Sequence, residues 1–142
     1  METGEIRRRV LRMIADAKGN AIAQREQVSA GEAAGRDVLS RLVTPLTKTV
    51  ASALIAEGYR CSVSTPIDAV RLSFEPSGYD YIEFAVDTTN DPPALVARTS
   101  RQRGNRMFNQ EQIIALHPSI GELADEVLLG FLLDELLPFV AR

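Results

Sequence analysis

Cysteine, histidine and tryptophan are almost missing from this sequence, which has one cysteine, one histidine and no tryptophan in 142 residues. A single thiol, Cys61, excludes an internal disulfide and is typical of a reducing compartment, so we expect a cytoplasmic protein. A structural zinc site needs several clustered cysteine and histidine ligands. The sequence therefore predicts no metal site. It predicts no cofactor either, because Gly31 and Gly35 do not have the context of a phosphate-binding loop.

Long hydrophobic runs are missing as well. The most apolar stretch, residues 127–140, contains Asp134 and Glu135 and is shorter than the ~20 apolar residues that a membrane span requires. The N-terminal residues include arginines but no apolar core behind them, which is not the pattern of a secretory signal. We therefore expect no membrane span.

The composition of the whole chain, with 45% hydrophobic and 25% charged residues, is typical of one globular domain. We divide it into an N-terminal helical segment (residues 1–57), an antiparallel sheet (58–108) and a C-terminal helical segment (109–142). The net charge of −3 argues against a generally basic nucleic-acid binder, although it leaves room for a local basic patch.

The N-terminal segment predicts two helices or one long helix. Apolar residues recur at helical spacing from Ile6 to Ala17, and Thr3 is a candidate N-cap. Ser29 followed by Glu32 matches a capping box, so we expect a break near residues 28–29, with one uninterrupted helix as the alternative. A second apolar face comprises Val38, Leu39, Leu42, Val43, Leu46, Val50, Ala53 and Leu54.

Pro45 falls inside that second face. A proline in a helix interior removes a backbone donor and costs ~3 kcal/mol. Because the apolar face continues in phase across Pro45, we expect one kinked helix. The competing interpretation is a new helix with Thr44 as its N-cap.

The middle of the chain alternates between apolar and polar residues with period two. This pattern predicts strands at about residues 59–64, 70–75, 81–87 and 94–100, with a short fifth strand near 106–108. Residues 112–116 fit either a strand or a helix. Short strands joined by short turns are typical of an antiparallel meander, which needs helices on one face only. The fold class is therefore α+β.

The C-terminal segment predicts a helix over residues 119–142, with a capping box at Ser119 and Glu122. Its main apolar surface comprises Leu123, Val127, Leu128, Phe131, Leu132, Leu136, Leu137 and Val140, and Leu129 and Leu133 extend it around the helix. A helix that is apolar nearly all round must be covered nearly all round. We expect a homodimer or higher homo-oligomer, with an interface at Leu129, Leu133, Leu136 and Leu137.

Four arginines form the strongest candidate binding site: Arg98, Arg101, Arg103 and Arg106. No acidic residue lies among them, the guanidinium group suits phosphate and carboxylate, and Phe108 offers a stacking surface. Two other interpretations remain open. The arginines protect a solvated hairpin from edge pairing, or they meet acidic groups of a partner subunit.

Other candidate groups have simpler explanations. Arg7, Arg8, Arg9 and Arg12 suit a membrane or nucleic-acid contact, but a solvated helix is favoured. His117 has no catalytic partner in the sequence, and Cys61 falls on the apolar face of a strand.

Further chemical sites have weak signals. Glu83, Asp87 and Asp91 match no calcium loop. Gly31 and Gly35 indicate close helix packing. Glu135 falls within an apolar helix face, so it must reach water or pair with an arginine.

No catalytic residue can be named from this sequence. We expect a non-enzymatic homo-oligomeric binding or adaptor module, and we leave a second, different protein open as a further partner. One alternative is nucleic-acid or phosphate-ligand binding by the hairpin arginines. A second is a small enzyme or ligand carrier with a pocket between sheet and helices.

Overall fold

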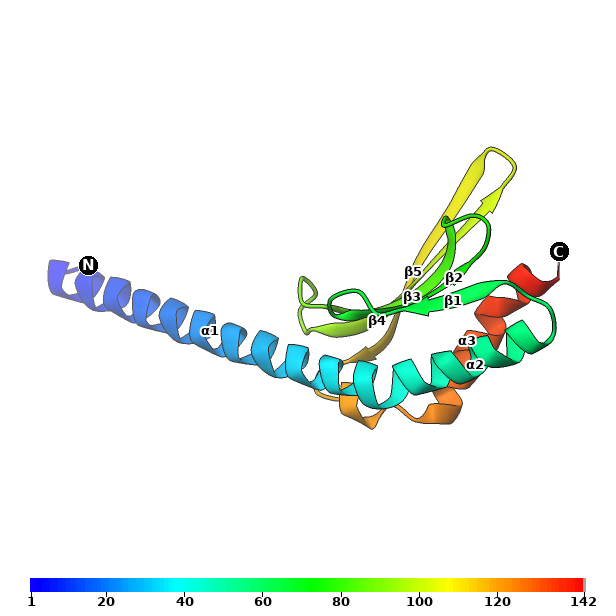
Figure 1. The fold of residues 1–142 in the computed structure, drawn as a ribbon. Helices are drawn as coiled ribbons and strands as arrows, with labels where there is room; N and C mark the ends of the chain where they lie inside the picture. The colour runs from blue at the N-terminus through cyan, green and yellow to red at the C-terminus, as the bar shows by residue number, and fades with distance from the viewer. Residues whose placement is uncertain (142) are drawn as a thin grey trace.

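The chain begins with one continuous helical rod. In the computed structural model, which describes residues 1–141, α1 (Thr3–Val38) leads through a π-helical turn (Leu39–Val43) into α2 (Thr44–Ala56) (Figure 1). The predicted break near residues 28–29 is wrong, because α1 passes through Ser29 without interruption. Packing of the following turns against the sheet holds this segment helical despite its weak local signal.

The π-helical turn is the local response to Pro45. Proline has no N–H, and its ring clashes with the carbonyl four residues earlier, so the helix widens at this point. The backbone N–H of Thr44 donates to the carbonyl of Leu39, and the Thr44 hydroxyl donates to the same oxygen at 2.7 Å. The apolar face thus continues across Pro45 as expected, in one distorted helix.

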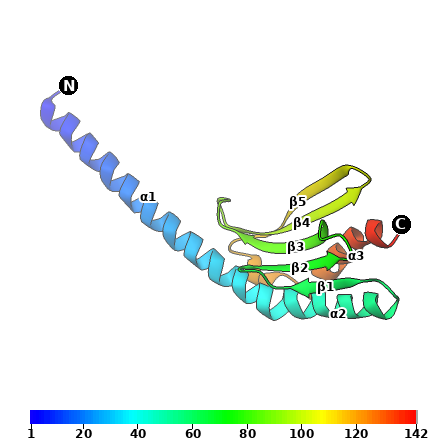
Figure 2. The same ribbon diagram turned by 45° about the horizontal axis from the view of Figure 1, so that its top comes forward.

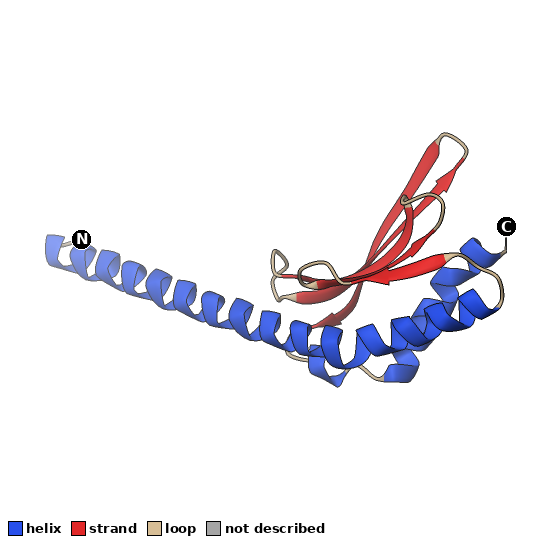
Figure 3. Ribbon diagram, in the orientation of Figure 1, coloured by secondary structure: helices blue, strands red, loops and turns tan. Residues whose placement is uncertain are grey.

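The sheet is a five-stranded antiparallel meander in the order β1-β2-β3-β4-β5 (Figures 2 and 3). Its strands are β1 (Cys61–Ser64), β2 (Ala69–Phe74), β3 (Asp80–Asp87), β4 (Ala94–Arg103) and β5 (Arg106–Leu116). The fifth strand was expected to be short, but it continues through residues 112–116. These residues are therefore strand, and the sheet ends at Leu116 and not near residue 108.

The C-terminal helix, α3 (Asp125–Val140), starts later than predicted. Ser119 precedes a short 3₁₀ turn, Ile120–Glu122, and its side chain makes no capping hydrogen bond. The chain then passes through Leu123 in an extended conformation before α3 begins. The capping-box pattern at Ser119 therefore marks a single turn and not the start of the helix.

The core lies between one face of the sheet and the helices. The rod contributes Val38 and Val43, α3 contributes Leu128 and Leu132, and the sheet contributes Leu72, Ile82, Phe84 and Leu95, all of them buried. Phe74 on β2 stacks on Phe139 of α3 with ring centroids 4.7 Å apart. Helices thus cover one face, as the alternation of the strands predicted.

Two glycines allow α1 to lie directly on the end of β3 and on the β3–β4 connection. A Cβ atom added to Gly31 would lie 2.6 Å from Cβ of Pro93, and one added to Gly35 would overlap Val86. Both glycines are buried. The close approach expected at these positions is present, but the neighbour is the end of β3 and the connection after it, and not a second helix.

One helix within residues 1–141, the rod at Thr3–Ala56, is long and apolar enough to cross a membrane by length and composition alone. Core helices of globular proteins meet the same criterion. In this rod Val38, Val43 and Val50 are buried in the core of the domain.

Candidate interaction surfaces

The first 26 residues form an arm that leaves the domain (Figures 1 and 2). Every residue of this arm is exposed except Glu5, which is half-buried. Burial on the rod begins at Gln27 and Val28. A helix in water gains most of its stability from packing an apolar face, so an arm of this length lacks the packing that would stabilise it.

An apolar stripe follows one side of the arm. It consists of Ile6, Val10, Met13, Ile14, Ala17, Ala21 and Val28, which fall within about a third of the helix circumference. Ile6 is 48% exposed, Val10 45% and Met13 62%. Within this region one series of residues alternates between spacings of four and three: Val10, Ile14, Ala17, Ala21, Gln24 and Val28. Gln24 is the only polar residue in the series. This is the spacing of a helix-pairing seam.

The stripe has the same helical phase as the buried side of the rod. Continuing its four-and-three spacing beyond Val28 leads to Gly31, Gly35 and Val38, which are buried. The domain therefore lies on the same side of the rod as the stripe. A second helix can follow the stripe only as far as the domain permits.

The basic residues of the arm are solvated. Arg7, Arg8, Arg9 and Arg12 are all exposed, and Arg9 pairs with Glu5 at 3.0 Å one turn away. A pair with this exposure contributes little to stability.

On α3, the four leucines of the predicted interface have different environments. Leu136 is 4% exposed and belongs to the core, so its inclusion in an interface was wrong. Leu129 is half-buried against the core. Leu133 is 55% exposed and Leu137 63% exposed, one turn apart on the outer side of α3. The helix therefore leaves a small apolar patch uncovered, and not most of its circumference.

Glu135 of α3 has an environment that the sequence did not suggest. Its carboxylate accepts hydrogen bonds from the Thr99 hydroxyl at 3.2 Å and from Nε2 of Gln112 at 3.3 Å. Both donors are neutral groups on the helix-covered side of β4 and β5. Two strand side chains thus satisfy a carboxylate for which an arginine or water was expected.

The four candidate arginines are divided between the two faces of the sheet. Arg98 lies on the open face, where it is 3.6 Å from Oε1 of Glu83 and 3.5 Å from Glu111. Arg101 and Arg103 follow Thr99 at alternate positions of β4, and therefore share its helix-facing side. Arg106 pairs with Arg103, and Phe108 with Arg101, in the β4–β5 register.

Arg101, Arg103, Arg106 and Phe108 define a surface that we call the hairpin face. Arg103 and Arg106 are exposed, Arg101 is half-buried and Phe108 is 46% exposed. Among residues 1–141, no carboxylate forms an ion pair with any of the three arginines. The hairpin extends beyond the last pair between β3 and β4, Tyr81 with Ser100, so its tip projects from the sheet (Figure 1).

Arg98 instead belongs to a row of alternating charges across the open face. Arg71, Glu83, Arg98 and Glu111 are directly opposite one another in register on β2, β3, β4 and β5. Glu83 is 8% exposed and has arginines on both sides. Arg71 also lies over the ring of Tyr81, 4.2 Å from its centroid. This charge row satisfies a buried carboxylate and explains the position of Arg98.

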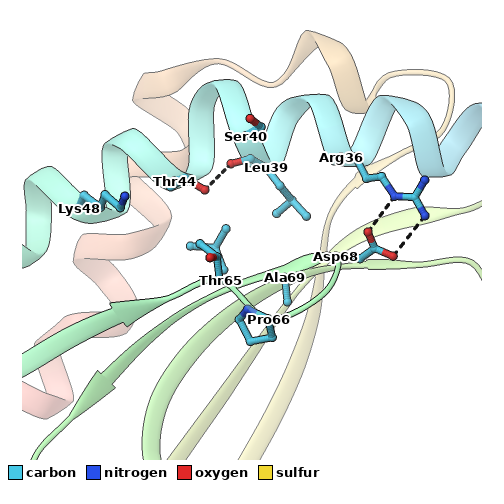
Figure 4. Close-up of a pocket in the computed structure, with 10 residues that line it drawn as sticks. Arg36, Leu39, Ser40, Thr44, Lys48, Thr65, Pro66, Asp68 and Ala69 are labelled. Atoms are coloured by element: carbon cyan, nitrogen blue, oxygen red, sulfur yellow. Dashed lines mark hydrogen bonds and ion pairs between the residues drawn. The ribbon is translucent and has the colours of Figure 1, made fainter.

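A cavity of 410 Å³ lies where the π-helical turn faces the β1–β2 connection (Figure 4). Its polar lining includes Ser40, Lys48 and Thr65, while the Thr44 hydroxyl is already bonded to Leu39. At one side Nε of Arg36 donates to Asp68 at 2.8 Å. Asp68 has a positive φ of 56°. The ion pair lowers the pKa of Asp68 through this hydrogen bond and ties α1 to the turn before β2.

The remaining candidate groups have structural roles. Cys61 is buried, and its thiol lies 3.7 Å from the carbonyl of Ala51. Burial, and then the nearby Glu75 carboxylate, raise its pKa, so the predicted core position of Cys61 is confirmed. His117 is half-buried in the connection after β5, and its backbone N–H donates to the carbonyl of Pro93 at 2.8 Å.

The carboxylates considered for cation binding are separated by their contacts. Glu83 belongs to the charge row, whereas Asp87 accepts hydrogen bonds from Thr89 and Asn90 in a local turn. Those hydrogen bonds, with that of the Thr89 hydroxyl first, lower the pKa of Asp87. Within residues 1–141, no group of three or more histidine, cysteine or acidic side chains is arranged to hold a metal ion.

Sequence reasoning found the hairpin arginines but missed the arm as an isolated structure. The signal was present in the alternating spacing from Val10 to Val28, which the expected break near residue 28 obscured. No protein family, curated protein or solved structure matches the chain.

Proposed function

We propose that this chain is a self-associating binding module whose arm pairs with the arm of a second copy. The observation that carries the proposal is the apolar stripe on an arm whose residues, up to residue 26, are all exposed except Glu5. Burying a large apolar side chain is worth roughly 1.5–3 kcal/mol. Pairing two stripes removes several such side chains per copy from water and supplies the packing that the arm lacks.

An antiparallel pair fits the domain better than a parallel pair. Because the domain lies on the same side of the rod as the stripe, two parallel rods would bring both domains to the same place between them. In an antiparallel pair, each domain lies beyond the N-terminus of the other arm. The stripe of one copy then faces the stripe of the other from about Ile6 to Val28.

The charges of the arm favour the same direction. Residues 1–13 contain four arginines and two glutamates, a net charge of +2, whereas residues 16–32 contain two basic and three acidic residues, a net charge of −1. A parallel pair places the two arginine-rich ends side by side. An antiparallel pair places each of them opposite the more acidic part of the partner.

The mass in solution tests the self-association. We expect a dimer by light scattering at micromolar concentration, and a monomer for Val10→Glu combined with Ile14→Glu. Leu11→Glu combined with Ile22→Glu is the matched control, because these side chains are exposed on the same arm but lie off the stripe. A monomeric native chain at 100 µM protein (about a hundredfold above the expected range) contradicts the proposal.

A further variant separates the arm from the apolar patch on α3. The stripe variant is the chain with Val10→Glu and Ile14→Glu. If Leu133→Glu combined with Leu137→Glu produces a monomer while the stripe variant remains dimeric, α3 is the interface and the arm proposal is wrong. If the stripe variant alone dissociates, the patch on α3 is not required.

The direction of the pair is measured with one spin label per copy. The label is placed at Gly4→Cys in a chain that also carries Cys61→Ala. Antiparallel arms separate the two labels by roughly 35–45 Å at 1.5 Å per residue. Parallel arms bring them to about 10 Å, the usual distance between packed helices, and that result would contradict the antiparallel arrangement.

A further inference from the structure

We propose that the hairpin face binds single-stranded nucleic acid. This site is separate from the arm, and the proposal does not depend on self-association. It rests on the arrangement of Arg101, Arg103, Arg106 and Phe108 on one side of a two-stranded projection.

The hairpin face brings like charges together without neutralising them. Arg103 and Arg106 are directly opposite each other in the strand register, an arrangement that is unfavourable unless an anion lies between them. Arg101 is two residues from Arg103, about 6.8 Å along the strand. Within the described residues these three arginines have no ion pair, whereas Arg98, on the other face, has two. The three guanidinium groups remain available to a ligand that carries several negative charges.

Phe108 determines the kind of polyanion. It is 46% exposed and lies directly across from Arg101, so an aromatic ring and a guanidinium group are presented side by side. Proteins that bind single strands combine positive charge for the backbone with aromatic rings on which bases stack. An acidic peptide would use the arginines but gain little from the exposed ring.

A depression of 230 Å³ at the base of the hairpin face supports this assignment. It is lined by Thr99, Arg101, Phe108, Asn109 and Gln110. Gln110 shares the face of Phe108 at the alternate position of β5, and its amide group offers both donors and acceptors near the ring, as the edge of a base requires. In a duplex the bases are stacked on one another, so the ring of Phe108 favours an unpaired strand.

The position of the hairpin face allows it to bind a polyanion, although the whole chain has a net charge of −3. Residues 101–108 contain three arginines and no acidic residue, and they form the end of the hairpin farthest from the rod (Figure 1). A polyanion can therefore approach the tip without passing along the acidic parts of the domain.

Fluorescence anisotropy with a labelled 15-residue oligothymidine tests the proposal. The full chain should bind it at 50 mM salt, and affinity should fall with salt with a logarithmic slope of about −2, from −0.7 per phosphate for three contacts. Arg103→Ala combined with Arg106→Ala should weaken binding at least about tenfold and reduce the slope to about −0.7. Arg60→Ala combined with Lys48→Ala removes the same charge elsewhere and should change affinity less than threefold.

A second variant tests the stacking. Phe108→Leu keeps an apolar side chain but loses the aromatic face, and should weaken oligothymidine binding by about fivefold or more. It should leave the binding of inorganic polyphosphate unchanged, because polyphosphate has no bases. All the substituted residues are on the surface, so we expect the variants to fold. Thermal unfolding at an unchanged temperature would confirm this.

Several results would overturn the inference. They are no binding of oligothymidine at 50 mM salt, equal weakening by the Arg60 and Lys48 control, and no effect of Phe108→Leu. Tighter binding of a duplex of the same length or of polyglutamate would also contradict it and would assign the hairpin face to that class of ligand.

Discussion

Arg71 on β2 donates a hydrogen bond from Nε to Oε2 of Glu83 on β3 at 2.7 Å, and thereby holds a nearly buried carboxylate on the open face of the sheet. Arg98 approaches the other oxygen of Glu83 from β4. Four strands are therefore linked by side chains as well as by the backbone. The side chains of the charge row are therefore ordered by contacts with one another, although the open face is not covered by helices.

We predict that Glu83→Gln lowers the free energy of unfolding by about 1–3 kcal/mol, because two arginines lose the charge between them. Glu111→Gln, at the exposed end of the same row, should cost under ~0.5 kcal/mol. Urea denaturation of both variants measures the difference. Equal effects would show that the row does not depend on its buried member.

Gly35→Ala should lower the free energy of unfolding by about 1–3 kcal/mol, because the added Cβ overlaps Val86 and forces α1 away from β3. Gly130→Ala is the control, since nothing lies within 4 Å of a Cβ at that helical position. It should raise stability by about 0.5–1 kcal/mol through helix propensity alone. Thermal unfolding of the two variants would contradict this account if both changed stability in the same direction.

The ion pair between Arg36 and Asp68 predicts a pH dependence in the acid range. The Arg36 hydrogen bond lowers the pKa of Asp68 in the folded state, so the pair stabilises the fold above the unfolded pKa, and this contribution disappears as pH falls through the folded pKa. Asp68→Asn retains a residue that tolerates positive φ but removes the charge. Its melting temperature should be below that of the native chain at pH 7 and should approach it by pH 2. A difference that stays constant with pH would rule out the charge as the cause.

Cys61 should react slowly with a thiol reagent in the folded protein, because it is buried and its pKa is raised. A chain with Cys61→Ser and Ser62→Cys moves the thiol to the neighbouring exposed position. At pH 8 with Ellman's reagent, this control should react at least about a hundredfold faster, and both chains should react alike in urea. Similar rates in the folded state would place Cys61 at the surface.

The strands were the most predictable part of the fold, because one face is covered by helices and the other is open. Tyr81, Glu83 and Asp87 alternate with Ile82, Phe84 and Val86, and this pattern records directly which side meets the core. The length of β5 was less predictable. Residues such as Gln110 and Gln112 lie on an edge strand with little burial, so the alternation there is weak.

The helix boundaries were less predictable for another reason. The capping-box patterns at Ser29 and Ser119 describe only a few residues, and packing elsewhere decides whether a helix starts there. At Ser29 the buried contacts of Gly31 and Gly35 keep α1 continuous. At Ser119 the buried side chain of Ile120 fixes a single 3₁₀ turn, and α3 starts only at Asp125.

The candidate surfaces, too, could be predicted from the sequence only in part. The cluster of hairpin arginines could be found from spacing, but the separation of Arg98 from the others depends on strand register with Glu83 and Glu111. The exposure of the arm could not be predicted, because apolar periodicity from Ile6 to Ala17 indicates a helix face without indicating what covers it. Leu136 was misassigned for the same reason, since one helix carries both its core and its exposed leucines.

The π-helical turn sets the rotational phase between the arm and the sheet. Val38 and Val43 are five residues apart and would be about 140° apart around an ordinary α-helix, yet both are fully buried. The wider turn accommodates one extra residue and keeps both valines on the buried side, whereas winding the same residues as a regular α-helix would rotate the stripe by about 100° relative to the domain. The direction in which the arm presents its stripe therefore depends on the wider turn beside Pro45.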